Sequence, residues 1–356
     1  MKKTTKMLAT SLLVAVGLAA CGSNSSSSTN AANRLTMTTF GELTTLDSAD
    51  YDDVPSSDMM GQIFEGLYRV AANNKVELGM AAQEPKVSED GLVYTFTLRD
   101  AKWSDGSAVK AQDFVFTYRK LVNPQEGHVA QSADVFKNAK KIRSGELPVE
   151  ELGVKALDDK TLEITLENPA PYLPKLLTGS RFLPQSEAVA QKLGDQYGSN
   201  VSNVVVNGPF KLEGWTGSEL TWKLVKNADY WDASNVALNE VTVNVSKEVA
   251  TSVQLFDSKQ VQYTTISDQF VDQYKSQPTF HAQPKATMGY MSFNTLKPTT
   301  ANQHFRRAIA MAYDKQALTN NVLKDGSIPS TGLIPKSFAT NEATGKDFVD
   351  ESGDFL

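Results

Sequence analysis

The sequence predicts an α/β or α+β protein, with short strands and helices interleaved from Arg34 onward. Of its 356 residues, 40% are hydrophobic, which is enough to bury a large core spread over two or more domains. Apolar residues recur at every second position in some segments and at helical spacing in others. No repeat of fixed period occurs, and this excludes solenoids and propellers.

The first half of the chain alternates between these two patterns. Residues 34–40 are predicted to form a first strand, and Pro55 opens a helix whose apolar residues recur at i, i+3, i+4 and i+7. An Asp-Gly turn precedes an alternating strand over residues 92–98, and a helix is predicted over residues 111–122.

The second half continues in the same way. Alternation predicts strands over residues 162–166, 210–215, 220–225, 241–245 and 287–294. The second and third of these strands form a hairpin joined near Gly217. Helices are predicted over residues 247–258 and 305–312, and Asp314 is placed to cap a further helix after them.

Charge and cysteine content exclude several classes of function. Lys plus Arg is 35 against 41 for Asp plus Glu, and the net charge of −6 disfavours general attraction to nucleic acid or anionic lipid. One cysteine and three histidines exclude a disulfide scaffold, an iron–sulfur cluster and a Cys-rich zinc module. No nucleophile, metalloprotease, phosphate-binding or dinucleotide-binding motif occurs, so the sequence predicts no enzyme, no catalytic residue, no metal site and no cofactor. The histidines are interpreted as surface or packing residues: His128, His281 and His304.

The tryptophans allow two interpretations. Trp103, Trp215, Trp222 and Trp231 could line a recognition cleft, because rigid rings supply contact area at low entropic cost. Trp222, however, lies in register with Leu220 and Leu224, which favours packing in the core. The same interpretation is favoured for Trp231.

The N-terminus carries the features of a secretory signal. Three lysines precede an apolar run over residues 7–20 that is too short to span a membrane. The run ends in Leu-Ala-Ala-Cys-Gly, which resembles the lipobox of bacterial lipoproteins and implies that Cys21 is lipidated and becomes the mature N-terminus. An ordinary secretory peptide followed by a chance cysteine is the alternative. Residues 22–33 are rich in serine and would form a flexible tether of about 20 Å.

Four blocks of sequence share motifs with one family. They are TLD (45–47) with VP (54–55) and IFEGL (63–67), YTFTLRDAKWSDG (94–106) with AQDFVF (111–116), NGPF (207–210) with NADYW (227–231), and SFN (292–294) with FRRAIAMAYDK (305–315). Together they resemble the extracytoplasmic solute-binding proteins of peptide ABC importers, the oligopeptide- and dipeptide-binding family. The resemblance extends from Leu35 to the end of the chain.

The resemblance implies a periplasmic-binding-protein-like α/β fold of two lobes, with an extra subdomain and with peptide enclosed between the lobes. The implied domains are a signal peptide (1–20), a lipidated cysteine and tether (21–33), the first lobe in two parts (34–69 and 181–285), its subdomain (70–180) and the start of the second lobe (286–356). Family members are usually longer. We therefore expect a truncated second lobe that lacks the acid used against the ligand's N-terminal amine.

The function implied by the resemblance is that of a monomeric, lipid-anchored protein outside the cell membrane. It would capture oligopeptides and deliver them to an ABC import permease. Dipeptides, signalling peptides, nickel and haem are alternative ligands within the same family. A tethered hydrolase and a surface-display lipoprotein are the alternatives from other classes.

The peptide-binding residues implied by the resemblance surround the start of the first predicted helix. The backbone of Asp52, Asp53 and Val54 matches the segment that pairs with bound peptide as an added strand, and Ser56 follows it. The alternative for this segment is a solvated acidic loop that caps the helix at Ser56 or Ser57. Two further binding residues are expected at the cleft: Ser267, at the end of a strand, and Tyr290, on a crossing strand.

Overall fold

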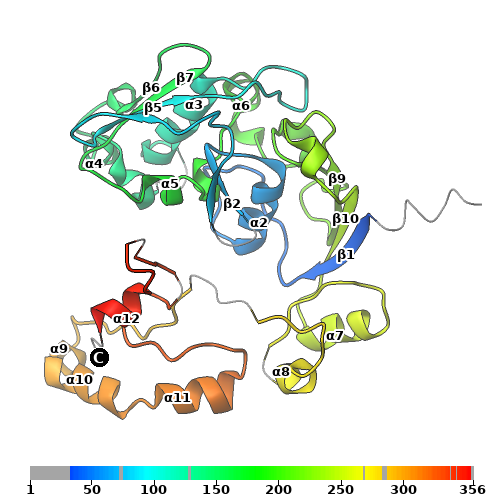
Figure 1. The fold of residues 1–356 in the computed structure, drawn as a ribbon, viewed down its shortest axis with the longest axis vertical. Helices are drawn as coiled ribbons and strands as arrows, with labels where there is room; N and C mark the ends of the chain where they lie inside the picture. Colours follow the sequence, from blue (N-terminus) through cyan, green and yellow to red (C-terminus); the bar gives the residue numbers. More distant parts are fainter. Residues whose placement is uncertain are drawn as a thin grey trace, which may run out of the picture.

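The computed structural model of the chain, shown in Figure 1, describes residues 33–71, 75–126, 130–267, 269–282, 287–336, 338–341 and 343–353. The signal peptide, Cys21, most of the tether and His128 lie outside the described residues. In Figure 1 two sheets and their helices form an upper body, and the chain after about residue 290 forms an arc of helices below it.

The first sheet joins the start of the chain to a segment far along it. Its strand order is β1-β10-β9-β8, with β1 (Arg34–Thr39) parallel to β10 (Glu240–Val245) and the other pairs antiparallel. Strands β8 (Phe210–Glu213) and β9 (Thr221–Lys226) form the predicted hairpin. The alternation that predicted these strands separates a buried face from an outer one. Val241 and Val243 lie on the buried face.

Helix α2 (Val54–Ile63) packs beside this sheet. Its buried face carries Met59, Met60 and Ile63, and the Nε1 of Trp222 on β9 lies 3.2 Å from the sulfur of Met59. The NGPF loop packs against the end of α2, where a Cβ on Gly208 would come within 2.5 Å of the backbone of Ile63. The interpretation of Trp222 as a core residue is confirmed.

The second sheet is antiparallel and belongs to the middle of the chain. Its strand order is β4-β5-β7-β6, and α3 (Ala111–Val122) packs against β6 and β7. The strands are β4 (Lys86–Val87), β5 (Val93–Thr97), β6 (Val154–Ala156) and β7 (Thr161–Thr165), and a separate hairpin contains β2 (Tyr68–Val70) and β3 (Val76–Leu78). The predicted helix over residues 111–122 is thus confirmed to the residue.

Shorter helices complete the fold. The upper body contains α4 (Ala139–Arg143), α5 (Leu173–Leu176) and α6 (Glu187–Leu193), whereas α7 (Val249–Asp257) and α8 (Gln269–Tyr274) lie below β1, level with the arc, in Figure 1. Single 3₁₀ turns are η1 (Gln131–Val135), η2 (Val149–Glu151), η3 (Ser180–Phe182), η4 (Gly194–Gln196), η5 (Val201–Asn203) and η6 (Ala233–Asn235).

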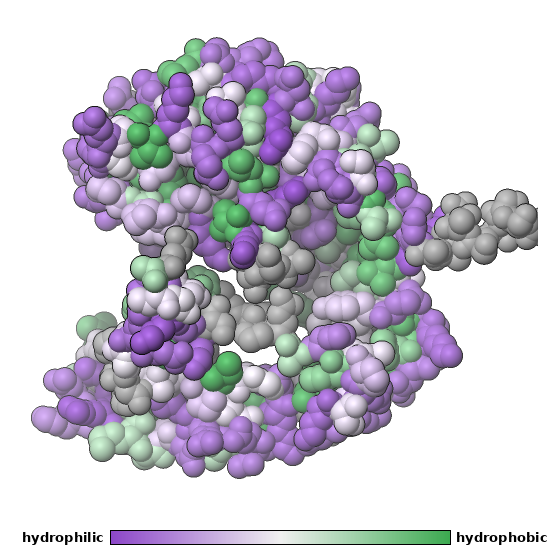
Figure 2. All heavy atoms as spheres, viewed as in Figure 1, coloured by the Kyte–Doolittle hydropathy of each residue, from purple (hydrophilic) through white to green (hydrophobic). Residues whose placement is uncertain are grey.

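The arc below the upper body is helical and exposed. It contains α9 (Pro298–Ala301), α10 (Gln303–Ala312), α11 (Lys315–Ala317), the π-helical turn η7 (Leu318–Leu323) and α12 (Phe348–Ser352). Asp314 caps α11 as predicted, since its Oδ1 accepts a hydrogen bond from the N–H of Ala317 at 2.8 Å. Figure 2 shows the surface hollowed between the arc and the upper body.

One predicted strand is wrong. The described residues 287–294 form no strand, although their apolar residues alternate. Alternation describes only which side chains share a face, whereas a strand also needs a neighbour for its backbone hydrogen bonds. None of the strands described in this structure pairs with this segment.

Candidate functional site

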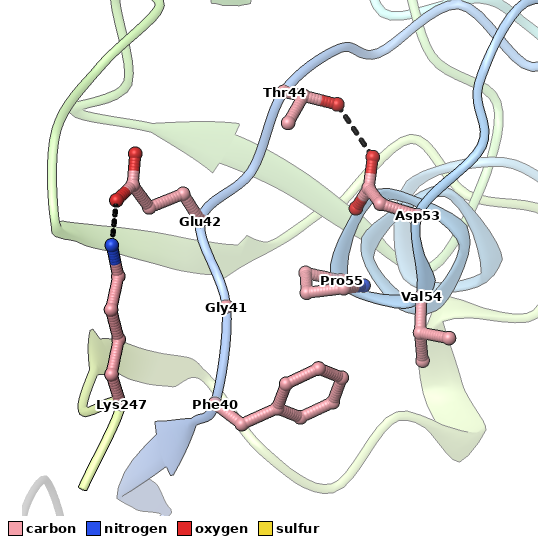
Figure 3. Close-up of a pocket in the computed structure, with 8 residues that line it drawn as sticks. All are labelled: Phe40, Gly41, Glu42, Thr44, Asp53, Val54, Pro55 and Lys247. Atoms are coloured by element: carbon pink, nitrogen blue, oxygen red, sulfur yellow. Dashed lines mark hydrogen bonds and ion pairs between the residues drawn. The ribbon is translucent and has the colours of Figure 1, made fainter.

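A groove of about 570 Å³ lies where the end of β1 meets the start of α2 (Figure 3). Three segments separated in sequence form it: the chain after β1, the N-terminus of α2 and the chain after β10. The residues that line it are Phe40, Gly41, Glu42, Thr44, Asp53, Val54, Pro55 and Lys247. In Figures 1 and 2, β1 and α2 lie on the side of the upper body that faces the hollow.

A cluster of hydrogen bonds fixes the start of α2 beside the chain after β1. Asp53 is the N-cap residue, and its Oδ1 accepts a hydrogen bond from the backbone N–H of Ser56 at 2.7 Å. The hydroxyl of Thr44 donates to Asp53 Oδ2 at 2.5 Å, and Ser56 Oγ accepts from the N–H of Thr44 at 3.1 Å. The segment therefore caps the helix, as one of its two interpretations expected, but the capping residue is Asp53, and Ser56 and Ser57 lie within α2.

The backbone next to the cap is extended. Asp53 has φ −118° and ψ 153°, and among the described residues no hydrogen bond is formed by the backbone N–H of Asp52 or Val54. An extended segment with unpaired N–H groups can accept another chain as an added strand. Capping by the side chain and pairing by the backbone are thus compatible at this segment.

The walls of the groove are mainly apolar. The side chains of Phe40 and Val54 are 58% and 52% exposed, and the ring of Phe40 extends toward Val54 below Pro55 (Figure 3). On the opposite wall, Lys247 Nζ and Glu42 Oε1 form an ion pair at 2.5 Å.

The other predicted binding residues lie elsewhere. Ser56 is fully buried, so its side chain supports the cap and does not line the groove. Ser267 follows an irregular segment in which Tyr263 forms one bridge to Met37, so Ser267 does not end a strand as expected. Tyr290 is 77% exposed on a segment without strand structure. Neither Ser267 nor Tyr290 lines the groove.

Sequence reasoning missed most of the groove. Phe40 ended the first predicted strand and is followed by Gly41, where a Cβ would lie 2.9 Å from Pro55 Cγ. An apolar residue followed by glycine at a strand end is a weak signal for an exposed turn. Lys247 gave no signal, because only the parallel pairing of β1 with β10 brings it to this place.

The family motifs meet in a buried cluster around Glu65. Its carboxylate accepts hydrogen bonds from the hydroxyl of Tyr230 at 2.8 Å and from the indole N–H of Trp231, and Arg69 Nη1 lies 3.3 Å away. Burial raises the pKa of Glu65 above its ordinary value. Arg99 stacks 3.9 Å above the Trp231 ring. The IFEGL, NADYW and YTFTLRDAKWSDG motifs therefore hold one another in place through this cluster, which uses the carboxylate of Glu65 within the protein.

Two further features are absent from the described ranges: a cluster of metal ligands and a membrane-spanning helix. No group of three or more His, Cys, Asp and Glu side chains there is arranged to hold a metal ion. No helix in the same ranges has the length and apolar character needed to cross a membrane.

Comparison with known proteins identifies the class. The family of bacterial extracellular solute-binding proteins, family 5 Middle, matches residues 75–353. The chain belongs to this family of solute-binding proteins. Its fold is the two-lobed α/β fold of OppA-like periplasmic binding proteins, as the sequence predicted.

Particular relatives narrow the comparison to peptide-binding proteins. The chain is 30% identical to a dipeptide-binding protein of Lactococcus lactis, over 98% of this chain and 65% of that protein. It is 29% identical to the oligopeptide-binding protein OppA of Bacillus subtilis, over 95% of this chain and 64% of that protein. The structure of Listeria monocytogenes OppA bound to peptide is similar with a TM-score of 0.81 and 36% identity, over 90% of this chain and 64% of that one. The chain thus spans just under two thirds of the length of these relatives.

Proposed function

We propose that this protein captures oligopeptides outside the cell and delivers them to an ABC import permease. The observation that carries the proposal is the backbone of residues 52–54, which is extended at Asp53 and whose N–H groups at Asp52 and Val54 are unpaired beside an open groove. Relatives named as oligopeptide- and dipeptide-binding proteins, and a similar structure that contains peptide, support it.

The proposed mechanism is strand addition. Main-chain hydrogen bonds between the ligand and residues 52–54 are common to all peptides, so they provide affinity without reading sequence. Ser56 acts indirectly by fixing the cap. Ser267 and Tyr290 are proposed as ligand contacts outside the groove. Closure of the hollow around the ligand would be a hinge motion between lobes.

The proposed lobes follow the sheets. We assign residues 34–69 and 181–285 to the first lobe, because β1 pairs with β10 in one sheet. Residues 70–180 form its subdomain, since the second sheet is built within them. Residues 286–356 belong to the second lobe.

A lipid anchor on Cys21 is proposed to keep the protein at the membrane. Two acyl chains provide stable attachment, at about 0.8 kcal/mol for each buried CH₂ group. Cys21→Ser is expected to abolish incorporation of radiolabelled fatty acid and to release protein into the medium or leave it as precursor. Unchanged acylation and membrane retention of this variant would contradict the anchor.

Native mass spectrometry tests peptide capture directly. The protein purified from its native host is expected to carry a series of small peptides that fragment into amino-acid sequences. A surface-display lipoprotein would carry none, and a hydrolase would convert added peptides into products over time. A protein free of peptide that also fails to bind an added peptide mixture would contradict the proposal.

A further inference from the structure

We propose that the groove beside residues 52–54 is a subsite for one apolar side chain of the bound peptide, and that Phe40 and Val54 determine this specificity. The inference rests on the proposed function, because it assumes that the ligand is a peptide. It adds which kind of side chain the ligand presents at this position.

The polar groups that line the groove already have partners. Asp53 receives hydrogen bonds from Thr44 and from the N–H of Ser56, and Glu42 is paired with Lys247. A polar ligand side chain in the groove would lose water and would have to compete with these existing pairs for its own partners, which is unfavourable. An apolar side chain would instead cover the exposed surfaces of Phe40 and Val54, which is favourable in proportion to the area buried.

Tight packing at the base of the groove favours a preformed subsite. Gly41 lies so close to Pro55 that an added Cβ would be 2.9 Å from Pro55 Cγ, and the Asp53 cap ties the two sides together through Thr44. A site that is already formed loses little entropy when the ligand binds.

The geometry of strand addition limits the preference to one ligand position. Side chains of an extended peptide alternate between two faces, so neighbours of the residue opposite Val54 point away from the groove. The expected pattern is a preference for apolar residues at a single position, with tolerance on either side.

Calorimetry with pentapeptides tests this pattern. The peptides contain alanine at every position except one, which is alanine, leucine, serine, lysine or glutamate in turn. With the protein purified from its native host and freed of ligand, we expect leucine to bind about tenfold more tightly than alanine at one position only. Serine, lysine and glutamate are expected to give no gain at that position.

Variants then locate the preference. Phe40→Ala should reduce the preference for leucine over alanine to about threefold, and Phe40→Leu should restore most of it. Tyr172→Ala is the matched control, because Tyr172 is an exposed aromatic residue outside the groove, and it should keep the full preference.

The two proposals fail in different ways. If no pentapeptide binds and no natural peptide is carried, the proposed function is wrong and the subsite falls with it. If peptides bind with no apolar preference at any position, or if Phe40→Ala retains the full preference, the subsite is wrong and peptide capture stands.

Discussion

Asp53 shows how one residue can support a binding site without its side chain contacting the ligand. Its carboxylate is used in capping α2 and in holding Thr44, so the charge that makes it conspicuous in the sequence is not offered to a ligand. Its backbone remains extended beside the groove. The role of the Asp53 side chain in the proposed function is therefore to orient the main chain of residues 52–54.

Val54 permits a test that separates backbone from side chain. Val54→Pro removes the N–H proposed to pair with the ligand and should weaken binding of an all-alanine pentapeptide about twofold to tenfold, the effect of one hydrogen bond of about 0.5–1.5 kcal/mol. Proline is accepted in the first turn of a helix, so α2 should persist. Calorimetry measures the affinity and circular dichroism the fold.

Two other variants serve as comparisons for this experiment. Val54→Ala keeps the N–H and should bind the same peptide normally. Asp53→Ala should lower the free energy of unfolding by about 1 kcal/mol through loss of the cap, but weaken binding far less than Val54→Pro. Equal effects of Val54→Pro and Asp53→Ala on affinity would contradict backbone pairing.

Asp113 links two helices of the upper body. Its Oδ2 accepts hydrogen bonds from the N–H of Lys110 at 2.9 Å and from the indole N–H of Trp103 at 3.1 Å, and its Oδ1 accepts from the N–H of Glu187 at 3.0 Å. One carboxylate therefore satisfies the starts of α3 and α6 together. Burial raises the pKa of Asp113 above its ordinary value of 3.8.

The raised pKa of Asp113 predicts a definite pH dependence. The folded state binds the proton more tightly than the unfolded state, so the contribution of Asp113 to stability grows as the pH falls from neutral toward 3.8 and is lost as the pH rises. Asp113→Asn should lower the free energy of unfolding by about 1.5–3 kcal/mol at pH 7. Urea unfolding at several pH values should show the difference between the two proteins widening toward acid. If the difference in free energy of unfolding between the two proteins instead narrows as the pH falls, the hydrogen bonds to the Asp113 carboxylate lower its pKa by more than burial raises it.

Two glycines at α2 allow opposite effects of a Gly→Ala change on the free energy of unfolding to be compared. Gly208→Ala would place a Cβ 2.5 Å from the backbone of Ile63 and should destabilise the fold by about 1–3 kcal/mol. Gly61, within α2, has no atom within 4 Å of the Cβ position, so Gly61→Ala should stabilise by about 0.5–1 kcal/mol. Thermal and urea unfolding measure both. Similar effects of the two changes would contradict the packing of the NGPF loop on α2.

Local sequence patterns predicted the helices and strands better than they predicted the groove. Helix α3, the strands of the first sheet, and β5 and β7 of the second sheet followed apolar periodicity, because each packs one face on a core. The short strands β4 and β6 were not predicted, and both residues of β4 are exposed. The strand expected over residues 287–294 failed because pairing depends on a neighbour and not on alternation. Phe40 and Lys247 could not be brought together from the sequence, since the parallel register of β1 and β10 is a long-range property.

At the scale of the whole molecule, the arc is bound to the rest of the described chain by few contacts. Lys324 Nζ lies 3.0 Å from Asp272 on α8, and Lys175 Nζ lies 5.8 Å from the centre of the Phe338 ring beside α5. Within the described residues of the range 287–353, Thr319 alone is buried. The strongly amphipathic helix α10 has no buried side chain.

Hydrogen exchange should reveal this difference in packing. Amides of the two sheets, which lie over a continuous buried core, should exchange only through opening reactions of high free energy. Amides from about residue 301 onward should exchange faster, because breaking the helical hydrogen bonds there exposes little additional apolar surface. The measurement is exchange followed by mass spectrometry of peptic fragments at pH 7, with α3 as the internal reference because it is a helix of similar length with a buried face. Fragments of α10 that are protected as strongly as those of α3 would show that the arc is covered by packing absent from this arrangement.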